Sequence, residues 1–146
     1  MAVTTDFYNS FLNDILEGTI DLDTDSIYAC LLTSGYSLDI DTHVDLGDIT
    51  GSEVSGTGYT ASGKALTTVS ASKDTANDLA FLDADSIAWT GATVSARYIV
   101  LYKKAATPAA SKLIECIDFG ESKAVTSGTL SASFATGGIF TLSATA

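Results

Sequence analysis

The sequence predicts a mainly β protein, a β-sandwich or barrel-like domain with one N-terminal helix. A single stretch near the N-terminus repeats its apolar residues at helical spacing, and the rest of the chain consists of short β-branched runs separated by Ser, Gly and Asp. The chain has 146 residues, 46% of them hydrophobic, with a mean hydropathy of +0.27. A chain of this size and composition can bury a core without a disulfide or a metal. We expect a single domain over residues 1–146.

The helix is predicted over residues 5–17, TDFYNSFLNDILE. Its apolar residues fall at i, i+1, i+4, i+5, i+8 and i+9, which places them in one stripe of a helix. Thr4 or Thr5 can cap the first turn, and Gly18 can end the last. The side chains expected to anchor this helix on the sheet are Phe11, Leu12, Ile15 and Leu16.

Seven strands are predicted after the helix, because apolar and β-branched runs alternate there with turn-forming residues. Together with one helix, seven short strands indicate a sandwich or a barrel. The predicted strands are Ser26–Thr33, Thr57–Ser70, Asp78–Leu82, Val94–Lys103, Lys112–Phe119, Thr129–Ala135 and Gly138–Leu142.

The clearest of these strands is Val94–Lys103, whose two faces are both apolar at the centre, as is typical of a central strand. Arg97 is the exception in this run. It is expected to pair with an acid or to lie at a subunit interface, because an unpaired buried guanidinium is costly. Strict alternation would place on one face Val94, Ala96, Tyr98, Val100 and Tyr102.

The charge of the chain is concentrated in its first half. Seven Lys and Arg stand against eighteen Asp and Glu, a formal net charge of −11. Residues 1–63 contain eleven acids and no Lys or Arg, whereas residues 64–146 balance seven acids with seven bases. Such a charge opposes binding to nucleic acid or to an anionic membrane. The acidic segment 34–56 is expected to be a long exposed loop. The neutral half is expected to hold surface that a partner or sister subunit covers.

Two further features concern cysteines and targeting. Cys30 and Cys116 lie in apolar runs, so they are expected to be small buried side chains rather than a disulfide or reactive thiols. The first ten residues lack the basic and apolar regions of a secretory signal. No run approaches the ~18 apolar residues of a membrane span. We expect a soluble protein made in the cytoplasm.

One segment comes within a residue of a phosphate-binding loop. Gly58-Tyr-Thr-Ala-Ser-Gly63-Lys64-Ala65 matches the pattern G-x-x-x-x-G-K-[ST] except at its last position, where the hydroxyl that binds magnesium is missing. The residues that follow, ALTTVSAS, favour a strand, whereas phosphate binding needs the start of a helix. A Gly-rich turn that leads into a strand is the preferred interpretation.

Clustered acids raise the question of a metal site. Asp21, Asp23 and Asp25 open like a calcium loop, but Ser26 stands where that loop needs glycine and Leu32 where it needs an acid. A second cluster surrounds His43, which we interpret as a surface histidine in an acidic loop rather than a ligand or a general base. The acids of this cluster are Asp39, Asp41, Asp45 and Asp48.

Paired carboxylates suggest one enzymatic hypothesis. Asp83 and Asp85 stand near Trp89, and two carboxylates beside an aromatic platform are what a glycosidase uses. The same D-x-D pattern flanks many turns, and one His among many Ser and Asp supports no nucleophilic triad. We therefore predict no catalytic, cofactor-binding or metal-binding residue, and we do not expect an enzyme.

A series of segments, taken in order along the chain, carries a family resemblance. It begins with Asn9-Ser10-Phe11, Gly18-Thr-Ile-Asp21-Leu-Asp23-Thr-Asp25 and Ile27-Tyr-Ala-Cys-Leu-Leu. It continues with Glu53-Val-Ser-Gly-Thr-Gly58-Tyr59-Thr-Ala-Ser-Gly63 and Phe81-Leu-Asp83-Ala-Asp85-Ser-Ile-Ala-Trp89, and ends with Ala96-Arg97-Tyr-Ile-Val-Leu-Tyr102-Lys103 and Ile117-Asp118-Phe119-Gly120. In this order the chain resembles small virion proteins of tailed bacteriophages, of the capsid decoration (cement) or head auxiliary type.

The resemblance implies a structural protein without cofactor or catalytic residues. Such proteins sit on the capsid surface of the virion, often as homotrimers at three-fold and quasi-three-fold positions, and clamp neighbouring major capsid protein subunits against the pressure of packaged DNA. The alternative is a tail, neck or receptor-binding component of the virion. A receptor-binding protein would expose Tyr36, Tyr59 and Trp89 for stacking on sugars, whereas we expect Tyr59 and Trp89 to pack at strand ends.

Overall fold

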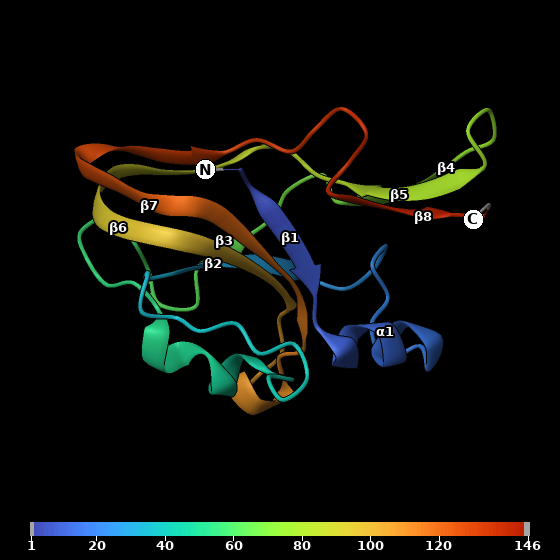
Figure 1. Ribbon diagram of the computed structural model, residues 1–146, viewed down its shortest axis with the longest axis horizontal. Coiled ribbons are helices and arrows are strands. Elements are labelled where there is room, and N and C mark those ends of the chain that lie inside the picture. Colours follow the sequence, from blue (N-terminus) through green and yellow to red (C-terminus); the bar gives the residue numbers. More distant parts are fainter. Residues whose placement is uncertain (1, 145–146) are drawn as a thin grey trace.

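The largest element of the structure is a five-stranded antiparallel sheet, seen in a computed structural model that describes residues 2–144 (Figure 1). The strand order is β1-β7-β6-β2-β3, so β6 lies at the centre, as the apolar run of Val94–Lys103 predicts. We call this sheet, together with the helix α1 (Asn9–Leu16) and the segment 34–56 that pack on it, the body. Its strands are β1 (Thr4–Phe7), β2 (Ile27–Leu32), β3 (Lys64–Ala65), β6 (Ile87–Lys103) and β7 (Leu113–Ala132).

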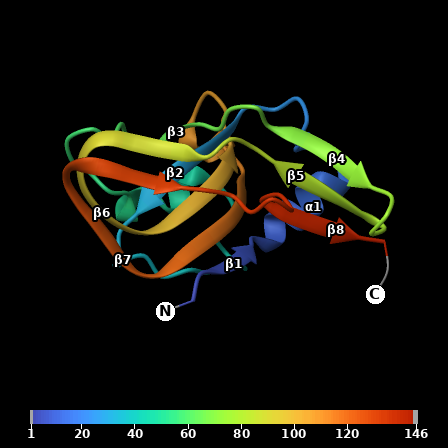
Figure 2. The same cartoon turned by 90° about the horizontal axis from the view of Figure 1, so that it is seen from above.

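A second, three-stranded antiparallel sheet projects from one end of the body, and we call it the arm (Figures 1 and 2). Its strands are β4 (Ser70–Asp74), β5 (Leu79–Asp83) and β8 (Phe140–Ser143), in the order β4-β5-β8. Two antiparallel sheets and one N-terminal helix make the fold mainly β and sandwich-like. The predicted fold class is confirmed.

The two long strands β6 and β7 pair along most of their length because bulges bend them without ending them. At the largest bulge Arg97 alone stands opposite residues 119–122, and Gly120 takes a φ of 77° there. Two strands were expected in this region, Lys112–Phe119 and Thr129–Ala135. That division is wrong, since the polar stretch between them continues the ladder as part of β7.

The bulge at Arg97 also changes which side chains share a face. Val94 and Ala96 belong to the same core cluster as Ile99 and Leu101, whereas Tyr98, Val100 and Tyr102 belong to a second cluster on the other side of the sheet. The expected face of five alternating residues is therefore wrong beyond Ala96. One irregular residue is enough to turn every later side chain to the opposite face.

The helix α1 (Asn9–Leu16) is shorter than predicted, because residues 4–7 pair with β7 as strand β1 instead of forming the first helical turn. Phe11 is buried and Ile15 partly buried, as expected for anchoring residues. Leu12 and Leu16 are 43% and 86% exposed, so their predicted role as anchors is wrong. Leu12 and Leu16 lie on the part of α1 that is left uncovered.

The acidic segment 34–56 is a long connection, as predicted, but it is not exposed throughout. It contains the short 3-10 turns η1 (Leu46–Asp48) and η2 (Thr50–Ser52). Tyr36, Leu46 and Ile49 are buried and complete the second core cluster with residues of β2, β6 and β7. Asp39, Asp41 and Asp48 are exposed, while the apolar side chains of the segment cover one face of the body.

Some of the remaining predicted strands are confirmed and one is wrong. Ser26–Thr33, Asp78–Leu82 and Gly138–Leu142 correspond to β2, β5 and β8 with shifted ends. The predicted strand Thr57–Ser70 is wrong, since only β3 forms there and β4 begins at Ser70. Another 3-10 turn, η3 (Pro108–Ala110), joins β6 to β7.

Candidate functional site

An open apolar groove lies between α1 and the inner face of the arm. Its widest part has a volume of about 460 Å³ and lies between the end of α1 with the turn after it, on one side, and the arm, on the other. A cavity of that size is within the range of natural binding pockets, roughly 300–1,000 Å³. The apolar side chains that line this part are Ile15, Leu16, Ile20, Leu22, Ala71 and Leu142.

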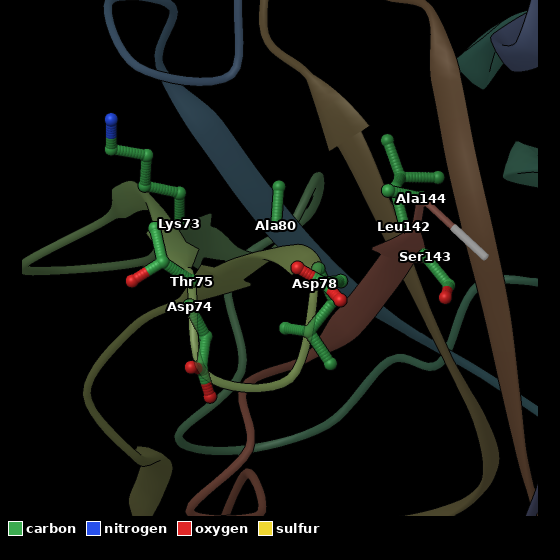
Figure 3. Close-up of a pocket in the computed structure, with 9 residues that line it drawn as sticks. Lys73, Asp74, Thr75, Asp78, Ala80, Leu142, Ser143 and Ala144 are labelled. Carbon is green, nitrogen blue, oxygen red and sulfur yellow. The ribbon is translucent and has the colours of Figure 1, made fainter.

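Two further hollows extend this feature along the arm. A small one of about 70 Å³ lies against Leu82 and Phe140, and one of about 380 Å³ lies near the tip of the arm beside Lys73 and Asp78. Leu142 lines all three hollows, so we treat them as one continuous groove. Figure 3 shows the part near the tip, with Lys73, Ala80 and Leu142 on the same side of the arm.

The strand register explains why the inner face of the arm is apolar. Ala71, Leu82 and Phe140 lie opposite one another across the three strands, and the next row is Lys73, Ala80 and Leu142. Directly opposed residues of antiparallel strands point to the same face. Five of these six residues line the small hollow, namely Ala71, Leu82, Phe140, Ala80 and Leu142, so a large part of the face is apolar.

An aromatic contact fixes the arm to the body at its base. The ring of Phe140 meets the ring of Phe7 edge to face at 4.9 Å between centroids, and that of Phe11 at 5.8 Å. Edge-to-face pairs of this kind add to the stability gained by burial. The fixed base and the projecting tip hold the walls of the groove apart.

Two large apolar side chains face each other across the groove without being covered. Four such side chains are exposed among residues 2–144, and two of them, Leu16 at 86% and Leu142 at 50%, line the groove. The others are Val3 and Leu12. Exposed apolar residues gathered in a concave surface indicate a place of contact with another molecule.

The charged residues at the α1 side of the groove are acidic. Asp21 and Asp23 line it and Glu17 stands at the end of α1; all three are exposed. Hydrogen bonds from the backbone of Asp23 and from Thr24 lower the pKa of Asp21, so its carboxylate is ionised at neutral pH. Asp25 is already neutralised by Lys103, at 2.9 Å. The nearest base on the arm is Lys73, at the far end.

The acids that suggested metal sites have structural partners. The backbone N–H of Asp21 donates to Asp25 at 2.8 Å, which closes the turn that follows α1. In the second cluster Asp45 and Asp48 form a capping box for η1, and Asp39 accepts hydrogen bonds from the backbone of Asp41 and Thr42. Over residues 2–144, no three His, Cys, Asp or Glu side chains gather closely enough to hold a metal ion.

His43 is half-buried and belongs to a hydrogen-bonded chain instead. Its Nδ1 lies 2.9 Å from the hydroxyl of Tyr36, which lies 2.9 Å from the hydroxyl of Tyr8. Burial raises the pKa of both tyrosines above its usual range. The chain ties segment 34–56 to the start of α1, and Tyr36 is a buried packing residue.

The segment that approximates a phosphate-binding loop is a turn followed by the two-residue strand β3, as the sequence favoured. A carboxylate of the chain itself occupies its donors, because Glu53 accepts from the N–H of Ser62 at 2.6 Å and from the hydroxyl of Tyr59 at 2.5 Å. Gly63 has a φ of 69°, and a Cβ there would collide with the backbone of Ala29. The glycine is needed for close packing on β2.

The carboxylates of the glycosidase hypothesis also hold turns. Asp83 accepts the N–H of Ala84 at 2.9 Å, and Asp85 accepts the hydroxyls of Thr67 and Thr68. Trp89 is 4% exposed and packs near Tyr59, so the prediction that these two aromatic residues are packing residues is confirmed. Trp89 therefore offers no exposed platform on which a sugar could stack.

The cysteines and Arg97 lie as the sequence predicts. Cys30 and Cys116 are buried and unbridged, each opposite Val100 on either side of β6, and burial raises the pKa of the Cys116 thiol to about 12. Two strands apart, about 9–10 Å, they are too far from each other for a disulfide. Arg97 pairs with Asp118 through two bonds of 3.0 Å.

One buried acid escaped the sequence reasoning. Glu115 of β7 is 1% exposed, one of its carboxyl oxygens has no hydrogen-bond partner, and burial raises its pKa to about 8. It stands opposite Phe7 and Leu101 in the ladder, both members of the first core cluster or packed against it. The run Leu-Ile-Glu-Cys-Ile held the signal, a single charge in an apolar strand.

Comparison of the chain with protein-family models, with curated proteins and with solved structures gave no match. Within residues 2–144, no helix has the length and apolar character needed to cross a bilayer.

Proposed function

We propose that the chain is a non-enzymatic structural protein of a tailed-phage virion. It binds the outer surface of the capsid shell and cements neighbouring major capsid protein subunits, as a homotrimer at three-fold and quasi-three-fold positions. It is made in the host cytoplasm and works without a cofactor.

One structural observation supports this proposal most directly: of the four large apolar side chains that are exposed among residues 2–144, two, Leu16 and Leu142, line the groove. A protein with such a surface is suited to permanent contact with a partner. The segments that resemble cement proteins also fold together, since Ile27-Tyr-Ala-Cys-Leu-Leu, Ala96–Lys103 and Ile117–Gly120 lie in the adjacent strands β2, β6 and β7.

A trimer would bind the shell more tightly than a single subunit could. Each subunit adds limited contact area, yet three subunits that hold several capsid subunits at once gain avidity without any strong single contact. Binding to the assembled shell, and not to free capsid subunits, stabilises the shell by mass action.

The test is the composition and strength of particles assembled with and without this chain. We expect the chain on DNA-filled heads separated from tails, and we expect heads that lack it to release DNA at a lower temperature. Its mass in solution by light scattering should be near three times 15.1 kDa. Finding the chain only on tails or necks would favour the alternative, a tail, neck or receptor-binding component. Its absence from particles would overturn both.

A further inference from the structure

The groove offers the chemistry of a binding site for a segment of polypeptide. It runs from the end of α1 along the inner face of the arm, so it is elongated, and its walls are apolar. Leu16 and Leu142 face it from opposite walls and are largely exposed. An open apolar trough with two uncovered leucines fits the side chains of a segment laid along it, in the manner of other groove-bound peptides.

The acidic residues around the groove determine which charge is favoured in the residues that flank a bound segment. Asp21 and Asp23 line the wide end, Glu17 stands beside it, and Lys103 forms an ion pair with Asp25 while its charge also acts on Asp21. A segment with acidic flanks would meet like charges there, whereas lysine or arginine would meet unpaired carboxylates. The wide end therefore selects a basic flank.

The same charges disfavour a second copy of this chain as the occupant. Two grooves facing each other would bring their acidic rims together, on molecules that each carry a net charge of −11. Of the four exposed large apolar side chains, Val3, Leu12 and Leu16 stand in segments without Lys or Arg.

We propose that the groove between α1 and the arm binds an apolar segment of another protein, flanked by lysine or arginine that pairs with Asp21 and Asp23. This inference deepens the proposed function, on which it rests only for the identity of the partner as a component of the shell. The leucines supply the contact area, and the acids orient the segment in the groove.

The test uses the full chain and two fluorescent synthetic peptides, one with an apolar leucine segment flanked by lysines and one in which glutamate replaces each lysine. Binding is measured by fluorescence anisotropy at physiological salt. We expect the lysine peptide to bind and the glutamate peptide not to bind. Replacing both wall leucines, Leu16→Ser with Leu142→Ser, should weaken binding by about tenfold or more, because the variant loses apolar surface that the bound peptide would cover.

Matched variants separate the groove from the overall acidity of the chain. Leu12→Ser removes an exposed leucine of α1 that does not line the groove, and should change binding less than about twofold. Asp21→Asn with Asp23→Asn should weaken binding more than Asp6→Asn with Glu121→Gln, which removes the same number of charges on β1 and β7. Circular dichroism confirms that each variant is folded.

Three results would overturn the inference: no binding of the lysine peptide, equal weakening by the groove and control variants, or self-association that is lost when both wall leucines are replaced. The last would make a second copy the occupant. The outcome is separable from the proposed function. Peptide binding with no chain on particles defeats the virion role alone, and normal attachment of the groove variants to particles defeats the groove alone.

Discussion

The body and the arm are both antiparallel sheets, yet they differ in how completely their strands are covered. Five of the six residues of β2 in the body are buried, whereas β5, the middle strand of the arm, buries one residue of five, Leu82. The sheet of the body is packed on one face by segment 34–56 and on the other by α1 and the base of the arm. The arm lacks a second layer near its tip.

This difference separates stability from recognition within one chain. Burial on both faces is what makes the body the source of folding free energy, since stability scales with the apolar area removed from water. A short three-stranded sheet with one partly covered face is marginal by itself and opens more readily. The arm therefore exposes apolar surface that could bind a partner, whereas the apolar surface of the body is buried in its own core.

The comparison predicts its largest contrast in paired leucine substitutions. Leu101→Ala, in the centre of the body, should lower the free energy of unfolding by ~2–5 kcal/mol, because Leu101 is fully buried and its loss leaves a cavity. Leu142→Ala, in the arm, should change it by less than ~0.5 kcal/mol. Urea denaturation measures both. Similar losses in the two variants would contradict the division between body and arm.

A second prediction concerns pH and the buried acid of the body. Burial raises the pKa of Glu115 from about 4.5 to about 8. The folded protein therefore retains a proton that the unfolded chain has released, and stability falls as pH rises from about 4.5 to about 8, by at most ~1.4 kcal/mol per pH unit. Below this window the contribution is unchanged, and above it the loss is complete.

Replacing the acid should remove that loss. Glu115→Gln is expected to be as stable as the natural chain near pH 4.5 and more stable at pH 8, measured by urea denaturation at both values. Glu17→Gln, at an exposed position, serves as the control and should follow the natural chain at both pH values. Parallel curves for Glu115→Gln and the natural chain would show that the carboxyl is not held neutral by burial.

The sequence identified the central strand of the body but not how other segments pair around it, for a physical reason. The alternation in Val94–Lys103 identified the central strand because both of its faces are buried by distant segments. The turn to the opposite face at Arg97 could not be read locally, since it depends on which residues of β7 stand opposite. Leu16 was expected to be an anchor for the same reason: the pairing of Thr4–Phe7 with β7, which shortens the helix, is non-local.

The groove lay beyond the reach of sequence reasoning because its walls come from three distant segments. α1, the β4–β5 hairpin and β8 meet only after β8 pairs with β5 across more than fifty residues of chain. The acids at its rim were visible as Asp21 and Asp23 but were weighed as a calcium loop. Glu115, in contrast, could have been recognised in the same way as Arg97, as one charge in an apolar run, but was missed.

A third prediction weakens the arm without touching the body. Gly138 has a φ of 94°, and a Cβ there would come within 2.5 Å of the carbonyl oxygen of Leu82. Gly138→Ala should therefore push β8 away from β5 and lower the free energy of local opening by ~1–3 kcal/mol. Hydrogen exchange should accelerate at Ile139, whose N–H donates to Leu82 at 2.6 Å, and remain slow in β2.

Gly18→Ala provides the control for this change. Gly18 has a comparable φ of 72°, but a Cβ there meets no atom within 4 Å. It should carry only the strain of the left-handed conformation, about 1–2 kcal/mol, and leave exchange in the arm unaltered. If both variants accelerated exchange in β5 and β8 equally, backbone strain rather than the close approach of β8 to β5 would explain the effect.

The smallest effect is expected at the bulge of β6, around the ion pair of Arg97 with Asp118. The guanidinium of Arg97 and the N–H of Gly120, at 2.7 Å, hold the pKa of Asp118 below its usual range. The stability this carboxylate contributes is present at neutral pH and is lost as pH falls through its lowered pKa.

Arg97→Ala should raise the pKa of Asp118 towards its ordinary value but not fully, because the hydrogen bond from Gly120 remains. Arg97→Lys should give an intermediate pKa, since an ammonium lacks the paired geometry of the guanidinium. Carboxyl NMR titration measures the pKa of Asp118 in the natural chain and in both variants. An unchanged pKa in Arg97→Ala would mean that the backbone of the bulge, and not the ion pair, lowers the pKa of Asp118.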